Sequence, residues 1–275
     1  MVIGASGFLG SRLLALGPRD VELTGTGNNR PVRAGNWRDA RLDVTSPSAV
    51  RSFLEERRPG AVFFTSYHNA DRTITVDGAV AAARIASQLG ARFLFTSTDL
   101  VFDGKGTNYN ENVPAAPIMP YGQMKLEAEV AVRDACPSAV ILRPALMAGE
   151  SGVMLRPAYE CGNLLRGMPV DLFTDEWRSP LHVDDAARAC WELISLEVSG
   201  TFHLGGPERL TRLELGKIVC ALYQFDPALL REAKRPDDRP RDVSLDSTRL
   251  TALLGWKPRA LSAIANESPL DAALV

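Results

Sequence analysis

Thr98, Tyr121 and Lys125 are the residues of this chain whose types and spacing suggest chemistry. Tyr121 and Lys125 stand four residues apart in a segment that continues through Ala131 with good helix formers, so both should lie on one helical face. An ammonium group beside a phenol favours the phenolate and lowers a phenol pKa that is ordinarily about 10. A tyrosine tuned in this way can donate or accept a proton near neutral pH, which predicts acid–base catalysis at Tyr121.

The Thr98 hydroxyl is expected at the end of a buried strand. Phe93–Phe95 is a short apolar run, and Ser97 and Thr98 follow it. Open α/β sheets bind their ligands at the carboxyl ends of their strands, so hydroxyl groups at this point are well placed for a ligand. Tyr-x-x-x-Lys alone also occurs on many exposed helices, and the interpretation therefore depends on a nucleotide-binding loop elsewhere in the chain.

Such a loop follows the first apolar residues, Met1–Ile3, which are fewer than the about five or six residues usual in a strand. Gly-x-x-Gly-x-x-Gly spacing lets the backbone turn tightly and approach a pyrophosphate at the start of a helix, which we expect over residues 8–16. A glycine-rich turn without a ligand is the alternative. The residues expected to contact the cofactor here are Gly4, Ser6, Gly7, Phe8, Leu9 and Gly10.

The end of the second predicted strand, Val21–Thr26, concerns the choice of cofactor. A carboxylate at this position would bind the ribose 2′-hydroxyl and repel a 2′-phosphate, but the chain continues with glycines and asparagines and then Arg30. This favours NADP(H), with Arg30 beside the phosphate. NAD(H) stays open as the alternative, in which Arg30 is an ordinary surface residue.

Strands and helices alternate through the first half of the chain. Arg41–Val44 is predicted as a short strand whose Asp43 reaches the adenine, and a helix with a Ser46 cap should end near Arg58. A strand over 61–65 and an alanine-rich helix over 76–89 follow. This alternation predicts the α/β class, with a Rossmann-like, doubly wound parallel sheet and helices on both faces.

The pattern is less regular in the second half. Ala139–Pro144 is predicted as a strand, Val183–Ser195 as a helix, and Thr211–Glu214 as a capping box that opens another helix. A strand from about Thr201 to Leu204 should return to the sheet. We therefore expect a Rossmann domain over 1–145 with a returning segment near 183–206, and a smaller substrate-binding lobe over 146–182 and 207–275.

Arginines cluster in one later loop of this lobe. Arg235, Arg239 and Arg241 alternate with prolines outside any predicted helix. Three guanidinium groups so close together could clamp a diphosphate, because arginine binds phosphate oxygens in a planar, two-pronged geometry. A solvated loop is the equally simple alternative.

Composition excludes several other classes of function. The 275 residues are 45% hydrophobic and 23% charged with a net charge of −2, so we expect an ordinary globular protein without a nucleic-acid-binding surface. We expect no membrane span and no signal peptide, which favours the cytoplasm. The cysteines and histidines are isolated from one another, and no metal site is expected.

Together, these motifs resemble the extended short-chain dehydrogenase/reductases. The glycine turn, Asp43, Ser97–Thr98 and the Tyr121/Lys125 pair occur in the order of that family. Residues 97–104, 173–180 and 239–243 are most similar to its dTDP-4-dehydrorhamnose reductase branch, and the resemblance covers nearly the whole chain.

The resemblance implies hydride transfer from NADPH to a 4-keto group on a nucleotide-linked deoxysugar. Tyr121 would protonate the developing alkoxide, Thr98 would bind the same oxygen, and Lys125 would bind the nicotinamide ribose. Leu100 occupies a place where related 4,6-dehydratases have an acidic residue, which disfavours dehydration. The resemblance adds Val44, Thr65, Tyr67, Ser97 and Pro144 to the cofactor contacts, and Arg178 and Arg239 to the substrate contacts with Thr98.

The chain also departs from the family pattern. Thr65, Ser66 and Tyr67 replace the usual Asn-Ala-Ala after the fourth strand, and Asp77 replaces a common asparagine. A dinucleotide-binding regulatory subunit with little turnover is therefore a second hypothesis, since a relative of the branch regulates methionine adenosyltransferase. A sugar-nucleotide epimerase is a third. The resemblance also allows a homodimer, because dimers are common in this family.

Overall fold

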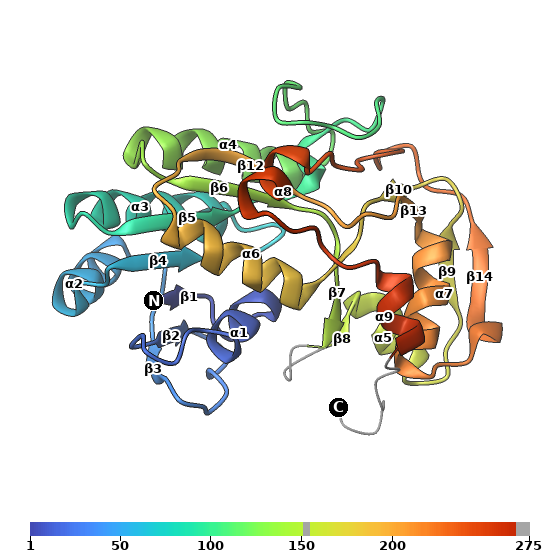
Figure 1. The fold of residues 1–275 in the computed structure, drawn as a ribbon, viewed down its shortest axis with the longest axis horizontal. Coiled ribbons are helices and arrows are strands. Elements are labelled where there is room, and N and C mark those ends of the chain that lie inside the picture. Colours follow the sequence, from blue (N-terminus) through green and yellow to red (C-terminus); the bar gives the residue numbers. More distant parts are fainter. Residues whose placement is uncertain (151–154, 268–275) are drawn as a thin grey trace.

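The computed structural model describes residues 1–150 and 155–267 of the chain. A seven-stranded sheet, parallel throughout, forms the larger part of the molecule, and a smaller lobe lies beside it (Figure 1). The strands, in spatial order, are β12 (Gly200–Leu204), β6 (Val140–Pro144), β5 (Arg92–Thr96), β4 (Ala61–Phe64), β1 (Val2–Ile3), β2 (Thr24–Gly27) and β3 (Arg38–Arg41).

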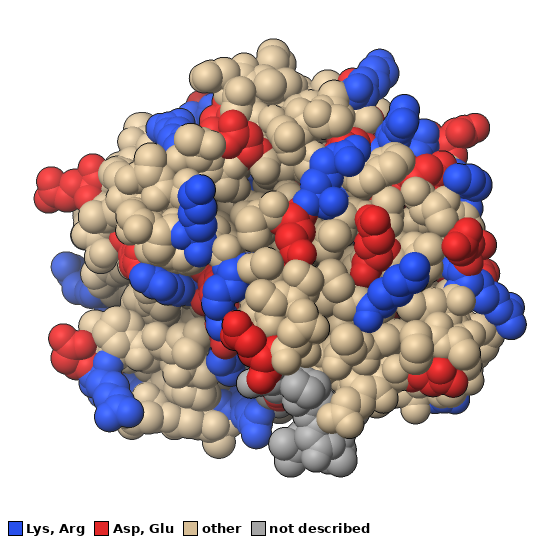
Figure 2. Space-filling model, turned by 45° about the vertical axis from the view of Figure 1, so that its right-hand side comes forward, with Lys and Arg blue, Asp and Glu red and all other residues tan. Residues whose placement is uncertain are grey.

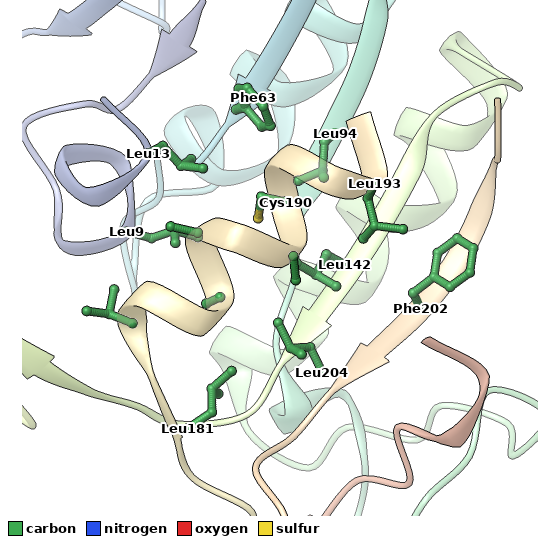
Figure 3. Close-up of a cluster of buried hydrophobic side chains, with 14 of the residues drawn as sticks. Leu9, Leu13, Phe63, Leu94, Leu142, Leu181, Cys190, Leu193, Phe202 and Leu204 are labelled. Carbon is green, nitrogen blue, oxygen red and sulfur yellow. The ribbon is translucent and has the colours of Figure 1, made fainter. Parts of the chain in front are cut away.

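Helices cover both faces of this sheet, because alternate strand residues point to opposite sides. Phe63 of β4 and Leu94 of β5 face α1 (Phe8–Ala15) and α6 (Val183–Ser195), as Figure 3 shows. Their neighbours along each strand pack into a second core on the other face. The helices of that face are α2 (Pro47–Arg57), α3 (Gly78–Gln88) and α4 (Pro120–Ala135). The predicted fold class is confirmed.

The direction of the strand order reverses at β1. This strand pairs with β2 on one side and with β4 on the other, so the loops after β1 and β4 diverge at the carboxyl edge of the sheet. Such a switch point opens a crevice where doubly wound sheets bind their ligands. The glycine turn follows β1 directly, and therefore lies at this crevice.

The smaller lobe has its own core between a helix and short strands. Leu213, Val219 and Tyr223 of α7 pack with Val170 and Leu172 of β9. The elements beyond β6, apart from α6 and β12, are β7 (Met147–Glu150), β8 (Leu155–Arg156), α5 (Ala158–Leu164), β9 (Val170–Phe173), β10 (Trp177–Arg178), β11 (Leu181–His182), β13 (Leu210–Thr211), α7 (Arg212–Tyr223), η3 (Pro227–Leu229), β14 (Leu230–Ala233), α8 (Thr248–Leu254) and α9 (Leu261–Glu267).

Several predicted elements have their expected limits. The helix over Val183–Ser195 is α6, and the capping box is complete, with the Thr211 hydroxyl on the Glu214 amide and the Glu214 carboxylate on the Thr211 amide. The strand predicted over Arg41–Val44 is wrong. β3 ends at Arg41, and Asp43 lies in the following turn because its carboxylate binds the Thr45 amide and hydroxyl.

The start of the predicted helix over 76–89 also differs. A π-helical turn, η1 (Thr73–Asp77), precedes α3, which begins at Gly78. A second short element, the 3₁₀ turn η2 (Asp99–Val101), follows β5. These two turns lie against the same helix, α4, and contribute to the site described below.

The surface of the lobe carries charges of both signs. On the face shown in Figure 2, basic and acidic side chains of the described residues are interspersed rather than gathered into one patch. Among residues 1–150 and 155–267, no helix is both long and apolar enough to cross a membrane. Within the same residues, no group of three or more His, Cys, Asp or Glu side chains could hold a metal ion.

Candidate active site

The glycine turn after β1 is held in a conformation that side chains would not allow. Gly4 has φ +90°, and a Cβ atom on Gly4 would stand 2.7 Å from the Ser66 amide nitrogen. A Cβ on Gly10 would stand 2.3 Å from the Gly4 carbonyl oxygen. Gly7 is the N-cap of α1 and provides no side-chain cap, so the backbone can approach a ligand at this helix end. The sequence motif is therefore a closely packed turn at the switch point of the sheet.

Thr65, at the end of β4, braces this turn. The Thr65 hydroxyl donates a hydrogen bond to the Ile3 carbonyl oxygen at 3.0 Å and is 3.3 Å from that of Gly4. The Thr65 side chain thus bonds to the protein backbone, whereas the side chain of Tyr67, two residues later, is 45% exposed.

The ends of β2 and β3 bring together polar residues at the place expected for the adenosine ribose. Arg30 is exposed, and the Arg41 Nε donates a hydrogen bond to Asn28 Oδ1 at 3.2 Å. Arg41 is not among the cofactor contacts that the sequence predicts, because its partner Asn28 follows a different strand. The signal for it is the parallel register of β2 and β3, in which Gly27 is opposite Arg41.

Asp43 and Val44 lie beside this group in the turn after β3. Asp43 remains exposed, and its hydrogen bonds from the Thr45 hydroxyl and amide lower the pKa of the carboxyl. Val44 is buried, and its carbonyl oxygen would be 2.9 Å from a Cβ on Gly78. The turn is therefore fixed against the start of α3.

Ser97 and Thr98 follow β5 and point to different partners. Ser97 is buried and donates a 2.5 Å hydrogen bond to Glu129 Oε1. The Thr98 hydroxyl accepts a hydrogen bond from the Leu100 amide at 3.2 Å and is 3.2 Å from Asp99 Oδ1. Thr98 is thus oriented by η2, while Ser97 joins a buried network on the α4 side.

Glu129 of α4 is the centre of that network. Its carboxylate has no exposed area and receives two hydrogen bonds from Arg143 of β6, at 2.8 and 2.6 Å. Arg143 Nη1 is also 3.3 Å from His203 Nε2 on β12. Next to Arg143, Pro144 ends β6 and is buried. The network joins the strand end that carries Thr98 to the edge of the sheet.

Tyr121 and Lys125 both belong to the first turns of α4, as predicted. Pro120 is the first residue of this helix, and the Lys125 Nζ donates a 2.7 Å hydrogen bond to the Thr96 carbonyl oxygen. Lys125 is 2% exposed, and burial lowers its pKa to about 7, with Glu129 opposing the shift. The group can therefore exist as ammonium or amine near neutral pH.

Aromatic rings surround the Lys125 ammonium group. The Nζ atom lies 4.6 Å from the ring centroid of Phe95, 5.4 Å from that of Tyr67 and 6.0 Å from that of Tyr121. The Tyr67 and Tyr121 centroids are 5.6 Å apart. The site thus unites residues from the loop after β4, from β5 and from α4.

Arg178 and Arg239 meet at one buried carboxylate of the lobe. Arg178 is 4% exposed and donates to Asp99 Oδ2 at 2.7 Å and to Glu176. Arg239 binds the same Glu176 through two nitrogen atoms, at 2.7 and 3.0 Å. Arg178 therefore links β10 to the residue that follows Thr98, and Arg239 has the more accessible side chain of the two.

Arg212, the first residue of α7, is a further charged group that the sequence reasoning missed. It is paired with Glu160 of α5, and burial followed by repulsion from Arg239 lowers its pKa to about 10. The sequence could have indicated Arg212 through the Thr211 capping box, because that motif makes Arg212 the first residue of a helix.

The three loop arginines do not converge on one point. Arg235 donates to the Arg239 carbonyl oxygen at 2.7 Å, whereas the Arg241 guanidinium lies 5.4 Å from the Trp177 ring centroid. Of the three, Arg239 is the one joined to Arg178 through Glu176.

A doubly wound parallel sheet, a glycine turn at its switch point, and a Tyr-x-x-x-Lys helix beside a strand-end threonine define an extended short-chain dehydrogenase/reductase. The chain belongs to the family described as the RmlD substrate binding domain, whose model matches residues 1–268. The resemblance to the dTDP-4-dehydrorhamnose reductase branch is confirmed.

Curated relatives carry several names. A probable low-salt glycan biosynthesis reductase from Haloferax volcanii is 35% identical over 59% of this chain and 58% of its own length. Methionine adenosyltransferase 2 subunit beta from Bos taurus is 29% identical over 75% of this chain, and the match covers 65% of the length of that protein. A probable dTDP-4,6-dihydroxy-2-methyloxan-3-one 4-ketoreductase from Streptomyces antibioticus is 31% identical over 94% of this chain and 91% of its own.

Solved structures have the same fold. A hypothetical dTDP-4-dehydrorhamnose reductase from Sulfolobus tokodaii is 26% identical, with a TM-score of 0.78 over 93% of this chain and 94% of its own. A dTDP-4-dehydrorhamnose reductase from Bacillus anthracis in complex with NADP is 20% identical, with a TM-score of 0.80 over 96% of both chains.

Proposed function

We propose that the protein is an NADPH-dependent reductase of a 4-keto group on a nucleotide-activated deoxysugar, with Tyr121 as the proton donor. The observation that carries this proposal is the Tyr121–Lys125 pair, whose ammonium group is anchored on the Thr96 carbonyl oxygen at the carboxyl end of β5. The relative from Streptomyces antibioticus that matches 94% of this chain is named a probable 4-ketoreductase of a dTDP-linked compound, which supports the class of substrate.

The residues at the switch point fit a nicotinamide dinucleotide. The turn from Gly4 to Gly10 keeps side chains away from the start of α1, where the helix dipole favours a pyrophosphate. Exposed Asp43 is proposed to contact the adenosine, and Val44, Thr65, Tyr67, Ser97 and Pro144 are proposed to line the rest of the site. We place Thr65 and Ser97 there as residues that shape the wall, since their hydroxyls bond within the protein.

NADP(H) is proposed over NAD(H). The end of β2 offers no carboxylate to bind a free 2′-hydroxyl, and exposed Arg30 and Arg41 are proposed to pair with a 2′-phosphate. A guanidinium group binds phosphate oxygens through charge-assisted hydrogen bonds, which an uncharged hydroxyl cannot match. The complex of the Bacillus anthracis protein with NADP is compatible with this choice.

In the proposed reaction, each catalytic residue has one task. Bound NADPH supplies the hydride to C4 of the sugar. The Tyr121 hydroxyl donates its proton to the carbonyl oxygen, which becomes the product hydroxyl, and the Thr98 hydroxyl donates a hydrogen bond to the same oxygen. The Lys125 ammonium binds the nicotinamide ribose and stabilises the tyrosinate that remains.

The substrate is proposed to enter between the sheet and the smaller lobe, with residues 1–145 and about 183–206 as the cofactor domain and 146–182 with 207–275 as the substrate lobe. Arg239 is the proposed diphosphate contact. Arg178 is proposed to act by holding Asp99, and with it Thr98, because its guanidinium is buried between two carboxylates.

The test is to add dTDP-4-keto-6-deoxyglucose and NADPH to the purified protein and to follow nicotinamide absorbance. Wild-type protein should consume NADPH in proportion to the sugar, and Tyr121→Phe should be slower by about 10²–10⁴-fold, the usual contribution of general acid catalysis. Full activity in the Tyr121→Phe variant would exclude Tyr121 as the acid.

A dinucleotide-binding regulatory subunit is the second candidate, favoured by the likeness to methionine adenosyltransferase 2 subunit beta and by the departure at Tyr67. Binding of NADPH without consumption, with every 4-ketosugar offered, would favour this candidate. A sugar-nucleotide epimerase would interconvert sugars without net loss of NADPH, and the same assay with product analysis separates it.

A further inference from the structure

Tyr67 occupies a place where the family resemblance leads one to expect a small residue, and its ring lies against both members of the proposed proton-transfer pair. Its centroid is 5.6 Å from that of Tyr121 and 5.4 Å from the Lys125 Nζ atom. The ring is 45% exposed, so one part contacts the pair while the rest meets solvent. Tyr67 therefore spans from the cofactor turn to the catalytic helix.

The backbone around Tyr67 is fixed on both sides. Before it, the Thr65 hydroxyl is bonded to the Ile3 carbonyl oxygen. After it, the His68 amide donates to Thr75 Oγ1 at 2.9 Å, and the Thr75 hydroxyl donates to the His68 carbonyl oxygen at 2.7 Å. Thr75 has no exposed area. The exposed ring is thus carried by a short, anchored segment.

The anchor itself is joined to the helix that carries Tyr121. Thr75 belongs to η1, which packs on α4, and Arg72 just before η1 forms ion pairs with Asp77 and with Glu127 of α4. Single π-helical turns are rare and frequently occur at functional sites. Here the turn sets the position of the Tyr67 loop relative to the start of α4.

Tyr67 is also the most accessible of the rings around the Lys125 ammonium. Phe95 has no exposed area, and Glu129, four residues after Lys125 on the same helix, is the charged group that faces it. The hydrogen bond to the Thr96 carbonyl oxygen holds the ammonium from within the sheet. Of the three rings near this charge, the Tyr67 ring thus has the largest contact with solvent.

We propose that Tyr67 is a positioning residue of the reductase site, whose ring holds Tyr121 in register with Lys125 and covers the ammonium on the side open to solvent. This inference rests on the proposed function for its catalytic consequence. The positioning depends on the aromatic ring and not on the Tyr67 hydroxyl. Tyr67→Phe should therefore preserve it, and Tyr67→Ala should abolish it.

The first measurement needs no substrate. The protein is labelled at lysine with ¹⁵N and ¹³C, and the pKa of Lys125 is measured by NMR titration of its side-chain resonance. The resonance that disappears in Lys125→Arg belongs to Lys125. The exposed lysines serve as internal references, and they are Lys105, Lys217, Lys234 and Lys257. Burial holds the Lys125 pKa at about 7. Tyr67→Ala admits water and should raise this pKa by at least about one unit toward the ordinary value of 10.5, while Tyr67→Phe leaves it in place.

The second measurement is the pH dependence of kcat/KM. In wild-type protein, kcat/KM for the sugar should fall as the pH rises and Lys125 loses its proton, which gives an alkaline limb in the profile. Tyr67→Ala should move this limb to higher pH and lower kcat at least about 10-fold. Phe53→Ala on α2 is the matched control, because Phe53 is also a half-buried ring in contact with a cation, Arg57, at 5.0 Å. This control should change neither the limb nor kcat.

An unchanged Lys125 pKa and an unchanged alkaline limb in Tyr67→Ala, with the fold intact by circular dichroism, would overturn the proposal. A changed KM for NADPH alone would overturn it as well, because Tyr67 would then be only a cofactor contact. Failure of the proposed function is distinguishable, since wild-type protein would consume no NADPH while the NMR titration of Tyr67→Ala still moved.

Discussion

Gly122 of α4 and Leu100 of η2 are in such close contact that a Cβ atom on Gly122 would stand 2.1 Å from the Leu100 carbonyl oxygen. Gly122 follows Tyr121, and the Leu100 amide binds the Thr98 hydroxyl. This contact therefore sets the proposed acid and its partner hydroxyl at a defined separation, although they are distant in the sequence.

Replacing Gly122 with alanine should separate these two residues. The methyl group would meet backbone rather than a yielding side chain, so α4 must shift away from η2, at about 1–3 kcal/mol of stability. We expect kcat to fall at least about 10-fold with NADPH binding largely kept. Gly162→Ala in α5 is the control, because open space surrounds its Cβ position. Equal kcat in the two variants would contradict this account of the contact.

Lys125 should destabilise the fold below neutral pH. Its pKa is about 7 in the folded protein and about 10.5 in the unfolded chain, so between these values the unfolded chain binds more protons and stability rises with pH. Below pH 7 the full cost of a buried ammonium is present. We therefore expect Lys125→Met to raise Tm relative to wild type more at pH 6 than at pH 9. A Tm difference that does not depend on pH would mean that Lys125 titrates normally.

Arg30 and Arg41 should determine the preference for NADPH. A hydrogen bond to a charged group contributes about 1.5–3 kcal/mol, so Arg30→Ala and Arg41→Ala should each raise the Kd for NADPH about 10- to 100-fold and hardly change that for NADH. Arg51→Ala on α2, an exposed arginine paired with Glu55, is the control. Equal losses for both cofactors would show that neither arginine contacts the 2′-phosphate.

The buried pair of Glu129 and Arg143 should be strongly coupled. Removing one partner leaves an uncompensated charge in the core, so Glu129→Met or Arg143→Met alone should cost about 3–5 kcal/mol in the free energy of unfolding. The double variant should cost less than the sum of the two, since neither charge then remains. Additive losses in chemical denaturation would argue against a direct pair.

Local patterns in the sequence predicted the elements of this fold well where the signal is itself local. The Thr211–Glu214 capping box and the limits of α6 depend on residues within a few positions of one another. The sequence predicts a strand at Asp43, whereas a side-chain hydrogen bond with Thr45 makes the segment a turn. Periodicity carries no information about such bonds.

The sequence proposes residues for the candidate site but not their arrangement in space. The four-residue spacing of Tyr121 and Lys125 predicts their common helix face, yet the ring of Tyr67 reaches them from a loop more than fifty residues earlier. Arg212 and Arg41 were missed for the same reason, since their significance arises from neighbours supplied by other elements. Contacts of this kind depend on sheet order and lobe docking, which single-residue patterns do not encode.

The central claim is hydride transfer to a sugar carbonyl with Tyr121 as the acid, and one measurement addresses it directly. NADPH with deuterium at the transferred position is mixed with dTDP-4-keto-6-deoxyglucose and the protein, and the product is examined by NMR. Deuterium at C4 of the sugar, formed rapidly by wild-type protein and about 10²–10⁴-fold more slowly by Tyr121→Phe, is the predicted result. Deuterium that stays in the cofactor, or equal rates in both proteins, would contradict the account.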